Sequence, residues 1–282
     1  MVELVYGNTK AQISNLGAEL KSFKLSGAEY IWQGDKHVWN SSSPILFPIC
    51  SSLKDNEYIY GGKTYRMPKH GFASNRFFGV EHRTGNTVTF LLKSDESDKP
   101  QYPFDYELRI TYSLSDAKLD VCYEVKNFSA DKMYFSIGAH EGYRLPCGLE
   151  NYEIEFSKKE TLYSYLLKGD TLTDEKDLIL KNSNILPLKY DYFKDDALIF
   201  KNLKSKSAII KTRERKRKIK VTFDGFDYFL IWTIPKADFV CLEPWCGITD
   251  NVNHDKDITK KEGINELSPG ETFIRSHSIE II

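Results

Sequence analysis

Residues Leu108–Val125 read Leu-Arg-Ile-Thr-Tyr-Ser-Leu, then Ser-Asp-Ala-Lys, then Leu-Asp-Val-Cys-Tyr-Glu-Val. In the two outer segments apolar or aromatic residues alternate with polar ones, so successive side chains would point to opposite faces of a strand. The polar residues Ser115–Lys118 between them are typical of a turn. This stretch therefore predicts an antiparallel hairpin with one buried face and one face in water.

The same period of two recurs on both sides of this hairpin. It appears in Val88–Leu92 and in Ile219–Phe223, while Phe239–Leu242 is a continuous apolar run typical of a strand buried on both faces. We find no long amphipathic helical pattern, and Gly, Asn, Asp and Pro separate the strand-like segments along the whole length. These patterns predict an all-β fold, a large antiparallel β-sandwich that residues 1–282 form as a single domain.

The charge balance favours a small neutral or singly charged ligand. The 282 residues include 39 Lys and Arg against 40 Asp and Glu, whereas nucleic-acid binders usually concentrate basic residues. The N-terminal residues lack a signal-peptide pattern, and no stretch has the length and apolarity of a membrane span. We therefore expect a cytoplasmic protein with no nucleic-acid or membrane partner. The five cysteines have no paired spacing and are expected to be free thiols.

One local charge excess stands apart from this balance, the basic run Lys211–Lys218. Two interpretations are open: an anion-binding patch, or a solvated edge hairpin whose charges discourage pairing with other strands. Because the chain as a whole is nearly neutral, we favour the edge hairpin.

A glycine pair leads the chain toward the first candidate site residue. Gly61-Gly62 lies between two short aromatic segments and predicts a two-residue hairpin turn, since Gly supplies the positive φ that such turns need. Pro68 has no N–H and ends strand pairing, and Gly71 lets the backbone turn directly after His70. His70 is therefore expected on a shaped loop, where binding and catalytic residues concentrate.

Two further titratable residues lie at the ends of strand-like segments beside Gly or Pro. Glu243 follows an apolar run and precedes Pro244, a location where burial would shift the pKa of the carboxyl and suit it to act as a general base. His140 lies between Gly138 and Gly142 and can exchange a proton near neutral pH. A hydrogen-bonded structural role is the alternative for each of them. The other histidines, His37, His82, His254 and His277, are expected to be solvated.

Six short motifs occur in a fixed order along nearly the whole chain. They are Leu16–Leu20, Pro44–Asn56, His70–Ala73, Gly138–His140, Cys241–Trp245 and Leu267–Glu271. In this order they resemble the aldose 1-epimerase (galactose mutarotase) family, and most closely its LacX-like branch. The resemblance implies a galactose mutarotase-like supersandwich and an isomerase acting on a small-molecule sugar in carbohydrate metabolism.

The resemblance also implies roles for individual residues. Glu243 would be the general base, His140 the general acid, and His70 a second histidine that binds and polarises the sugar near its anomeric centre. Asp227 would correspond to a ligand of a substrate hydroxyl. Apart from the resemblance, Trp245 directly follows Glu243-Pro244, where its ring could pack against the apolar face of a sugar, although tryptophans are more often core residues.

This set of residue types fits the interconversion of α and β anomers. The reaction removes the proton of the C1 hydroxyl, protonates the ring oxygen, opens the ring, rotates about C1–C2 and closes the ring from the other face. A carboxylate and an imidazole on opposite sides of the anomeric centre can perform both transfers. No metal, nucleotide or redox cofactor is required.

The chain departs from the family pattern at two places. Ser51-Ser52 stands where many relatives have Gly-Arg, and Ser74 stands where many have Arg; Lys54 and Arg76 are the nearby cations that could replace them as substrate ligands. Loss of guanidinium groups supports one alternative, a non-catalytic sugar-binding or sensing protein. A hexose-6-phosphate 1-epimerase is another alternative, but a 6-phosphate normally calls for Arg, Lys or helix N-termini, so we expect a sugar held by neutral hydrogen bonds and apolar stacking. A third alternative is a metal site built from two histidines and a glutamate, His70, His140 and Glu243. We expect a monomer or a homodimer.

Overall fold

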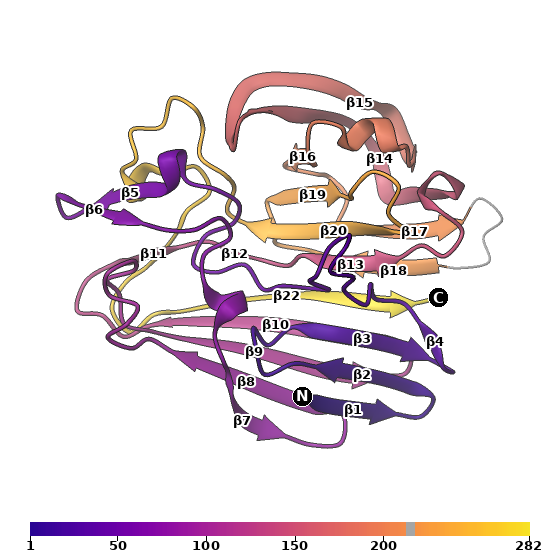
Figure 1. Cartoon of the computed structure of the whole chain (residues 1–282), viewed down its shortest axis with the longest axis horizontal. Helices are drawn as coiled ribbons and strands as arrows, with labels where there is room; N and C mark the ends of the chain where they lie inside the picture. Colours follow the sequence, from indigo (N-terminus) through magenta and orange to yellow (C-terminus); the bar gives the residue numbers. More distant parts are fainter. Residues whose placement is uncertain (213–217) are drawn as a thin grey trace.

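Strands and tight turns account for almost all of the regular structure in the computed structural model, which describes residues 1–212 and 218–282 (Figure 1). Within these residues no α-helix occurs, and the helical segments are single 3₁₀ turns. Every pairing between named strands is antiparallel, as the alternating sequence patterns predict.

The largest sheet has nine strands in the order β15-β14-β17-β18-β22-β10-β9-β8-β7. Their bounds are β7 (Gly79–Arg83), β8 (Thr87–Lys93), β9 (Tyr106–Ser115), β10 (Lys118–Asn127), β14 (Tyr152–Lys168), β15 (Thr171–Pro187), β17 (Ser207–Thr212), β18 (Lys218–Thr222) and β22 (Thr272–Ile281). The predicted hairpin is confirmed: β9 and β10 pair from Ser115 opposite Lys118, and alternate residues of both strands are buried. Period-two patterning therefore sets which face of this sheet forms the core.

Smaller sheets cover the nine-stranded sheet and complete an antiparallel β-sandwich (Figure 1). They contain β1 (Val2–Tyr6), β2 (Thr9–Ile13), β3 (Leu20–Leu25) and β4 (Ala28–Glu29); β12 (Ile137–Gly138), β13 (Glu141–Arg144), β16 (Leu198–Lys201), β19 (Tyr228–Trp232) and β20 (Phe239–Cys246); the pair β5 (Glu57–Tyr60) and β6 (Lys63–Arg66); and the pair β11 (Met133–Phe135) and β21 (Asn265–Leu267). One apolar cluster extends from Val2 to Ile281 between these layers. The all-β sandwich predicted from the sequence is thus the observed fold.

Strand β20 is the centre of the layer that carries the site. All eight of its residues are buried, which confirms the prediction for the apolar run Phe239–Leu242 and extends it to the four residues that follow. It pairs with β19 on one side and with β12 and β13 on the other. Any polar side chain on this strand is therefore held inside the molecule by neighbours on both sides.

The basic run lies elsewhere than predicted, as far as it is described. Strands β17 and β18, which contribute Lys211 and Lys218, lie between β14 and β22 in the interior of the large sheet and not at an edge. Strand β17 also pairs with β14, and β18 also pairs with β22. The local charge pattern could not reveal these pairings, because the partner strands are distant in sequence. Residues 213–217, the rest of the predicted edge hairpin, lie outside the described part. Among the described residues, none of the helical turns has the length and apolarity to cross a membrane.

Candidate active site

His70 is held by a reciprocal contact with Ser51. The backbone N–H of His70 donates to the carbonyl oxygen of Ser51 at 2.7 Å, and the backbone N–H of Ser51 donates to Nδ1 of the His70 ring at 3.1 Å. Both residues have positive φ, 66° and 58°, a conformation that is uncommon outside glycine and concentrates at functional sites. Because Nδ1 accepts a hydrogen bond, the neutral His70 ring carries its proton on Nε2.

The approach to His70 follows the predicted route. The Gly61-Gly62 turn joins β5 and β6, both glycines have positive φ, and pairing ends at Arg66 before Pro68. Gly71, at φ 72°, passes so near the chain that an added Cβ would lie 2.3 Å from the carbonyl oxygen of Phe47. Only glycine fits this close approach, so the turn after His70 depends on it.

Strand register brings Glu243 and His140 together. Gly138 on β12 lies opposite Trp245, and Glu141 on β13 lies opposite Leu242, so the connection between them places His140 across from Glu243. His140 Nε2 is 3.5 Å from Glu243 Oε2, and the two residues are only 8 % and 2 % exposed. The imidazole and the carboxyl are therefore direct neighbours, not the separated pair that we expected on opposite sides of a sugar.

One cavity of about 610 Å³ contains all three of these residues. The His70 ring meets the His140 ring edge to face with centroids 5.5 Å apart, and it meets Trp245 in the same way at 5.9 Å. The remaining wall combines polar side chains, such as Ser41, Ser74 and Asn75, with apolar and aromatic ones, among them Trp39, Leu46, Leu167, Ile199, Leu230 and Trp232. A concave, largely apolar site with a few convergent polar groups is the usual form of a small-molecule site.

Burial shifts the proton affinities of the three groups in opposite directions. It raises the pKa of Glu243 well above its ordinary value, and the nearby acidic residues Asp196 and Glu141 raise it further. Burial lowers the pKa of His140 to about 3 and holds the pKa of His70 well below its usual range. A charged form of either histidine is therefore costly unless a negative charge lies beside it. Glu243 and His140 are so close that they titrate as a pair.

Asp196 is a cavity residue that our reading of the sequence missed. It precedes β16, lines the cavity and has φ of 120°, a strained value for a side chain other than glycine. Lys69 Nζ lies 3.8 Å from Asp196 and 3.9 Å from Asp170 at the tip of the β14–β15 hairpin. The only signal in the sequence is an Asp195-Asp196 pair before an apolar strand, which is also common at ordinary surface turns.

The other predicted substrate ligands, Trp245 excepted, lie away from this cavity. Arg76 forms ion pairs with Asp95 and the fully buried Asp98. The ammonium group of Lys54 donates to the carbonyl oxygen of His254 at 3.1 Å. Asp227 is exposed at the start of β19. These side chains have structural partners or face solvent, so the geometry gives Lys54, Arg76 and Asp227 no part in a ligand site at this cavity.

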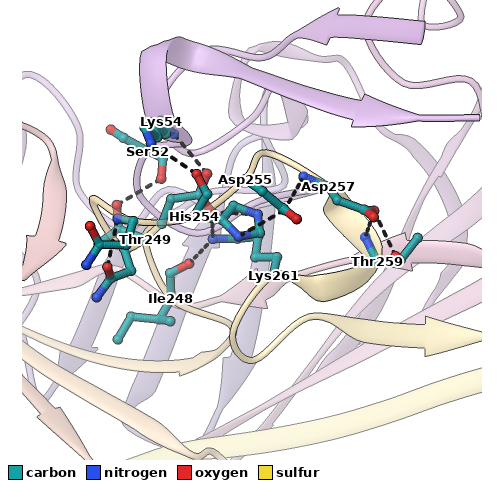
Figure 2. Close-up of polar contacts among 12 residues, drawn as sticks. Ser52, Lys54, Ile248, Thr249, His254, Asp255, Asp257, Thr259 and Lys261 are labelled. Carbon is teal, nitrogen blue, oxygen red and sulfur yellow. Dashed lines mark hydrogen bonds and ion pairs between the residues drawn. The ribbon is translucent and has the colours of Figure 1, made fainter. Parts of the chain in front are cut away.

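A buried ion pair between Lys261 and Asp250 anchors the loop that carries Ser51; Figure 2 shows Lys261 with Ser52 and Lys54 of this loop. Lys261 Nζ donates to Asp250 Oδ1 at 2.7 Å and to the carbonyl oxygen of Ile248 at 2.5 Å, and both charged side chains are 1 % exposed. The second carboxylate oxygen of Asp250 accepts the backbone N–H of Lys54, and the backbone N–H of Asp250 donates to the carbonyl oxygen of Ser52. The segment next to His70 is thus fixed from the loop after β20.

The expectation that His277 and His254 are solvated was wrong. His277 on β22 is 2 % exposed, lies 3.0 Å from a carboxylate oxygen of Glu141 and stacks on Tyr123. The side chain of His254 is 11 % exposed beside Asp250 and Asp255. The partner of His277, Glu141, is distant in the chain, whereas His254 lies beside acidic residues close to it in sequence, so its surroundings look polar although the ring is largely buried. His37 and His82 are exposed, as expected.

Comparison with known proteins assigns the chain to a family. The sequence profile described as aldose 1-epimerase matches residues 1–278. The chain belongs to the aldose 1-epimerase family. The assignment makes it a sugar epimerase and an isomerase. This family resemblance was the strongest prediction from the sequence motifs, and it is confirmed.

Relatives of known sequence or structure cover the whole chain of this aldose epimerase. The plasmid-encoded protein LacX of Lactococcus lactis is 31 % identical over 296 residues, which span 100 % of this chain and 99 % of that protein. A galactose mutarotase related enzyme from Lactobacillus acidophilus is 34 % identical, with a TM-score of 0.95, and covers 100 % of this chain and 97 % of its own. A galactose mutarotase-like protein from Lactobacillus casei is 29 % identical, also with a TM-score of 0.95, and both chains are fully covered. The fold is therefore that of galactose mutarotase-like proteins.

Proposed function

We propose that this epimerase interconverts the α and β anomers of an unphosphorylated aldohexose by general acid–base catalysis at the cavity that contains Glu243, His140 and His70. The observation that supports it most directly is the pairing of a buried carboxyl and a buried imidazole, 3.5 Å apart, on the cavity wall. Such a pair can carry a proton on either member, as the two transfers of ring opening and closure require.

The proposed chemistry uses the adjacency of the two groups. Glu243 removes the proton of the C1 hydroxyl while His140 protonates the ring oxygen, and the bond between C1 and the ring oxygen breaks to give the open-chain aldehyde. Both oxygens are bonded to C1, so an acid and a base that are neighbours can reach them together. Rotation about C1–C2 and the reverse transfers then give the other anomer.

The remaining cavity residues hold and polarise the sugar in this proposal. The Nε2–H of His70 donates to an oxygen near the anomeric centre, because Ser51 occupies Nδ1. Trp245 offers an aromatic wall for the apolar face of the ring. Asp196 replaces Asp227 as the proposed acceptor from a sugar hydroxyl, since it lines the cavity. The chemistry calls for no cofactor, and a cytosolic location and a monomeric or dimeric state stay predictions.

The pH profile should be broader on the acid side than an ordinary Glu–His pair would give. The active form carries one proton on the pair. The raised pKa of Glu243 and the lowered pKa of His140 place this proton mainly on Glu243, so it must pass to His140 before Glu243 acts as the base. Burial lowers the pKa of His140 to about 3, so the pair takes up a second proton only near that pH. The raised pKa of Glu243 means that the pair loses its last proton only at a pH above 4.5. Activity should therefore persist at pH 4.5. The check is kcat/KM from about pH 4 to 9, corrected for spontaneous mutarotation; half-loss at or above 4.5 on the acid side contradicts it.

The charges at the cavity favour a neutral sugar over a sugar phosphate. Lys69 is the one cation among the described lining residues, and it already lies beside Asp170 and Asp196. A phosphate would meet two carboxyl groups, Asp196 and Glu243, and no free guanidinium. We expect kcat/KM for glucose to exceed that for glucose 6-phosphate by about tenfold or more. A preference for the phosphate would instead favour a hexose-6-phosphate 1-epimerase.

Polarimetry tests the proposed function. Freshly dissolved α-D-glucose and α-D-galactose should approach their equilibrium rotation faster in the presence of the protein, in proportion to its concentration. Binding of either sugar without any acceleration would favour the non-catalytic sugar-binding alternative. If several aldoses show no binding and no acceleration, the proposal is overturned.

A further inference from the structure

We propose that His140, Cys241 and Glu243 form an inhibitory binding site for a borderline-soft divalent cation such as Zn²⁺ or Co²⁺. Only the inhibition, and not the binding, rests on the proposed function. The inference replaces the metal site considered from the sequence, which used His70 in place of Cys241.

The three side chains converge because of the pleat of β20. Cys241 and Glu243 are two residues apart on this strand, so they point to the same face. His140 joins them from the connection between β12 and β13. One ligand atom from each lies within 4.8 Å of the others. A tetrahedral Zn²⁺ with ordinary bond lengths separates its ligands by roughly 3.3–3.8 Å, so side-chain shifts of about one ångström would close the site.

The donor atoms are available to an ion. Glu243 Oε2 and His140 Nδ1 are buried and have no hydrogen-bond partner in the protein; the whole Glu243 residue is only 2 % exposed. Because no protein group uses these two lone-pair positions, both can accept a ligand without breaking a protein hydrogen bond. Cys241 is a free thiol. His70 is unsuitable, because Ser51 donates to its Nδ1 and its Nε2 carries a proton.

The donor set determines the class of ion. One nitrogen, one sulfur and one carboxylate oxygen suit Zn²⁺ or Co²⁺, whereas Mg²⁺ and Ca²⁺ prefer oxygen ligands. Three protein ligands leave one position of a tetrahedral ion for water, and two of the three ligand residues, His140 and Glu243, line the cavity. Binding would release the thiol proton and occupy the lone pair that Glu243 uses as a base. The bound ion should therefore compete with sugar and stop turnover.

Cobalt is the probe for binding, since a Co²⁺–thiolate bond gives a charge-transfer absorption in the near ultraviolet. Wild-type protein titrated with Co²⁺ should give this band at one equivalent, and the band should vanish in Cys241→Ser. Cys147→Ser is the matched control, because Cys147 is a free thiol but exposed, and it should keep the band. A band that survives in Cys241→Ser, or is lost in Cys147→Ser, overturns the site.

Zinc provides the functional arm. Zn²⁺ should inhibit wild-type epimerisation competitively with sugar, and Cys241→Ser should need a zinc concentration higher by on the order of 100-fold. X-ray absorption of the wild-type zinc complex should show one sulfur at about 2.3 Å with nitrogen or oxygen neighbours at about 2.0–2.1 Å, which needs no variant to fold. Absence of sulfur contradicts the site. A cobalt band without turnover on any sugar would support the metal site and reject the epimerase proposal. Turnover without the cobalt band would support the epimerase proposal and reject the metal site.

Discussion

Glu243→Gln should lower the rate of mutarotation by about 10²–10⁴-fold, equivalent to roughly 3–5 kcal/mol of activation free energy. The amide is nearly isosteric with the carboxyl, so the packing of β20 around this buried position should survive. It cannot accept the proton of the C1 hydroxyl. Sugar affinity should stay within about an order of magnitude, because contacts to the other hydroxyls are unchanged.

Companion variants separate catalysis from structure. His140→Asn should cause a comparable loss from the acid side. Because Glu243 and His140 act as a pair 3.5 Å apart, the double variant should be little worse than either single one. The measurements are polarimetric turnover and sugar titration for each variant. Wild-type turnover in Glu243→Gln would make Glu243 a structural carboxyl and place the base elsewhere.

Lys261→Met should destabilise the fold by about 3–5 kcal/mol, the usual effect of removing one partner of a buried ion pair. Lys261 and Asp250 are each 1 % exposed, so the variant leaves a buried carboxylate without its cation. Burial already lowers the pKa of Lys261, which shows the cost of a charge at this position. Chemical denaturation monitored by circular dichroism would measure the loss in the free energy of unfolding.

Lys260→Met is the matched control for this experiment. Lys260 is the preceding residue in the chain, but its side chain is 63 % exposed and pairs with the surface residues Asp255 and Asp257. Exposed pairs of this kind contribute little, so the control should be close to wild type. Equal stabilities of the two variants would show that the Lys261–Asp250 pair does not anchor the loop.

Much of the fold could be predicted because its signals are local. The alternation in Leu108–Val125 specifies both strands of a hairpin, and Gly61-Gly62 specifies a turn that few other residue pairs allow. The position of β17 and β18 inside the large sheet could not be predicted, because it depends on pairing with β14 and β22, which are distant in sequence.

The candidate site likewise contains residues that the sequence could indicate and residues that it could not. His70, His140 and Glu243 could be selected because each lies near a Gly or Pro, and the structure brings these three together. The expectation that Glu243 ends its strand was wrong, since β20 continues through Pro244 to Cys246 and pairs with β19 there. Asp196 could not be selected, since its position depends on where β16 begins beside β19. Lys54 and Arg76 were selected for charge and nearness in sequence, which cannot show that partners such as Asp98 already hold them.

The most direct test of the proposed activity is exchange between anomers at equilibrium. Magnetization-transfer NMR on aldohexose labelled with ¹³C at C1 measures the α-to-β rate without a coupling enzyme or a starting excess of one anomer. We expect exchange cross-peaks that grow with the concentration of wild-type protein and return to the spontaneous level with Glu243→Gln. Exchange at the spontaneous rate with wild-type protein, under conditions in which the sugar is bound, would contradict the account.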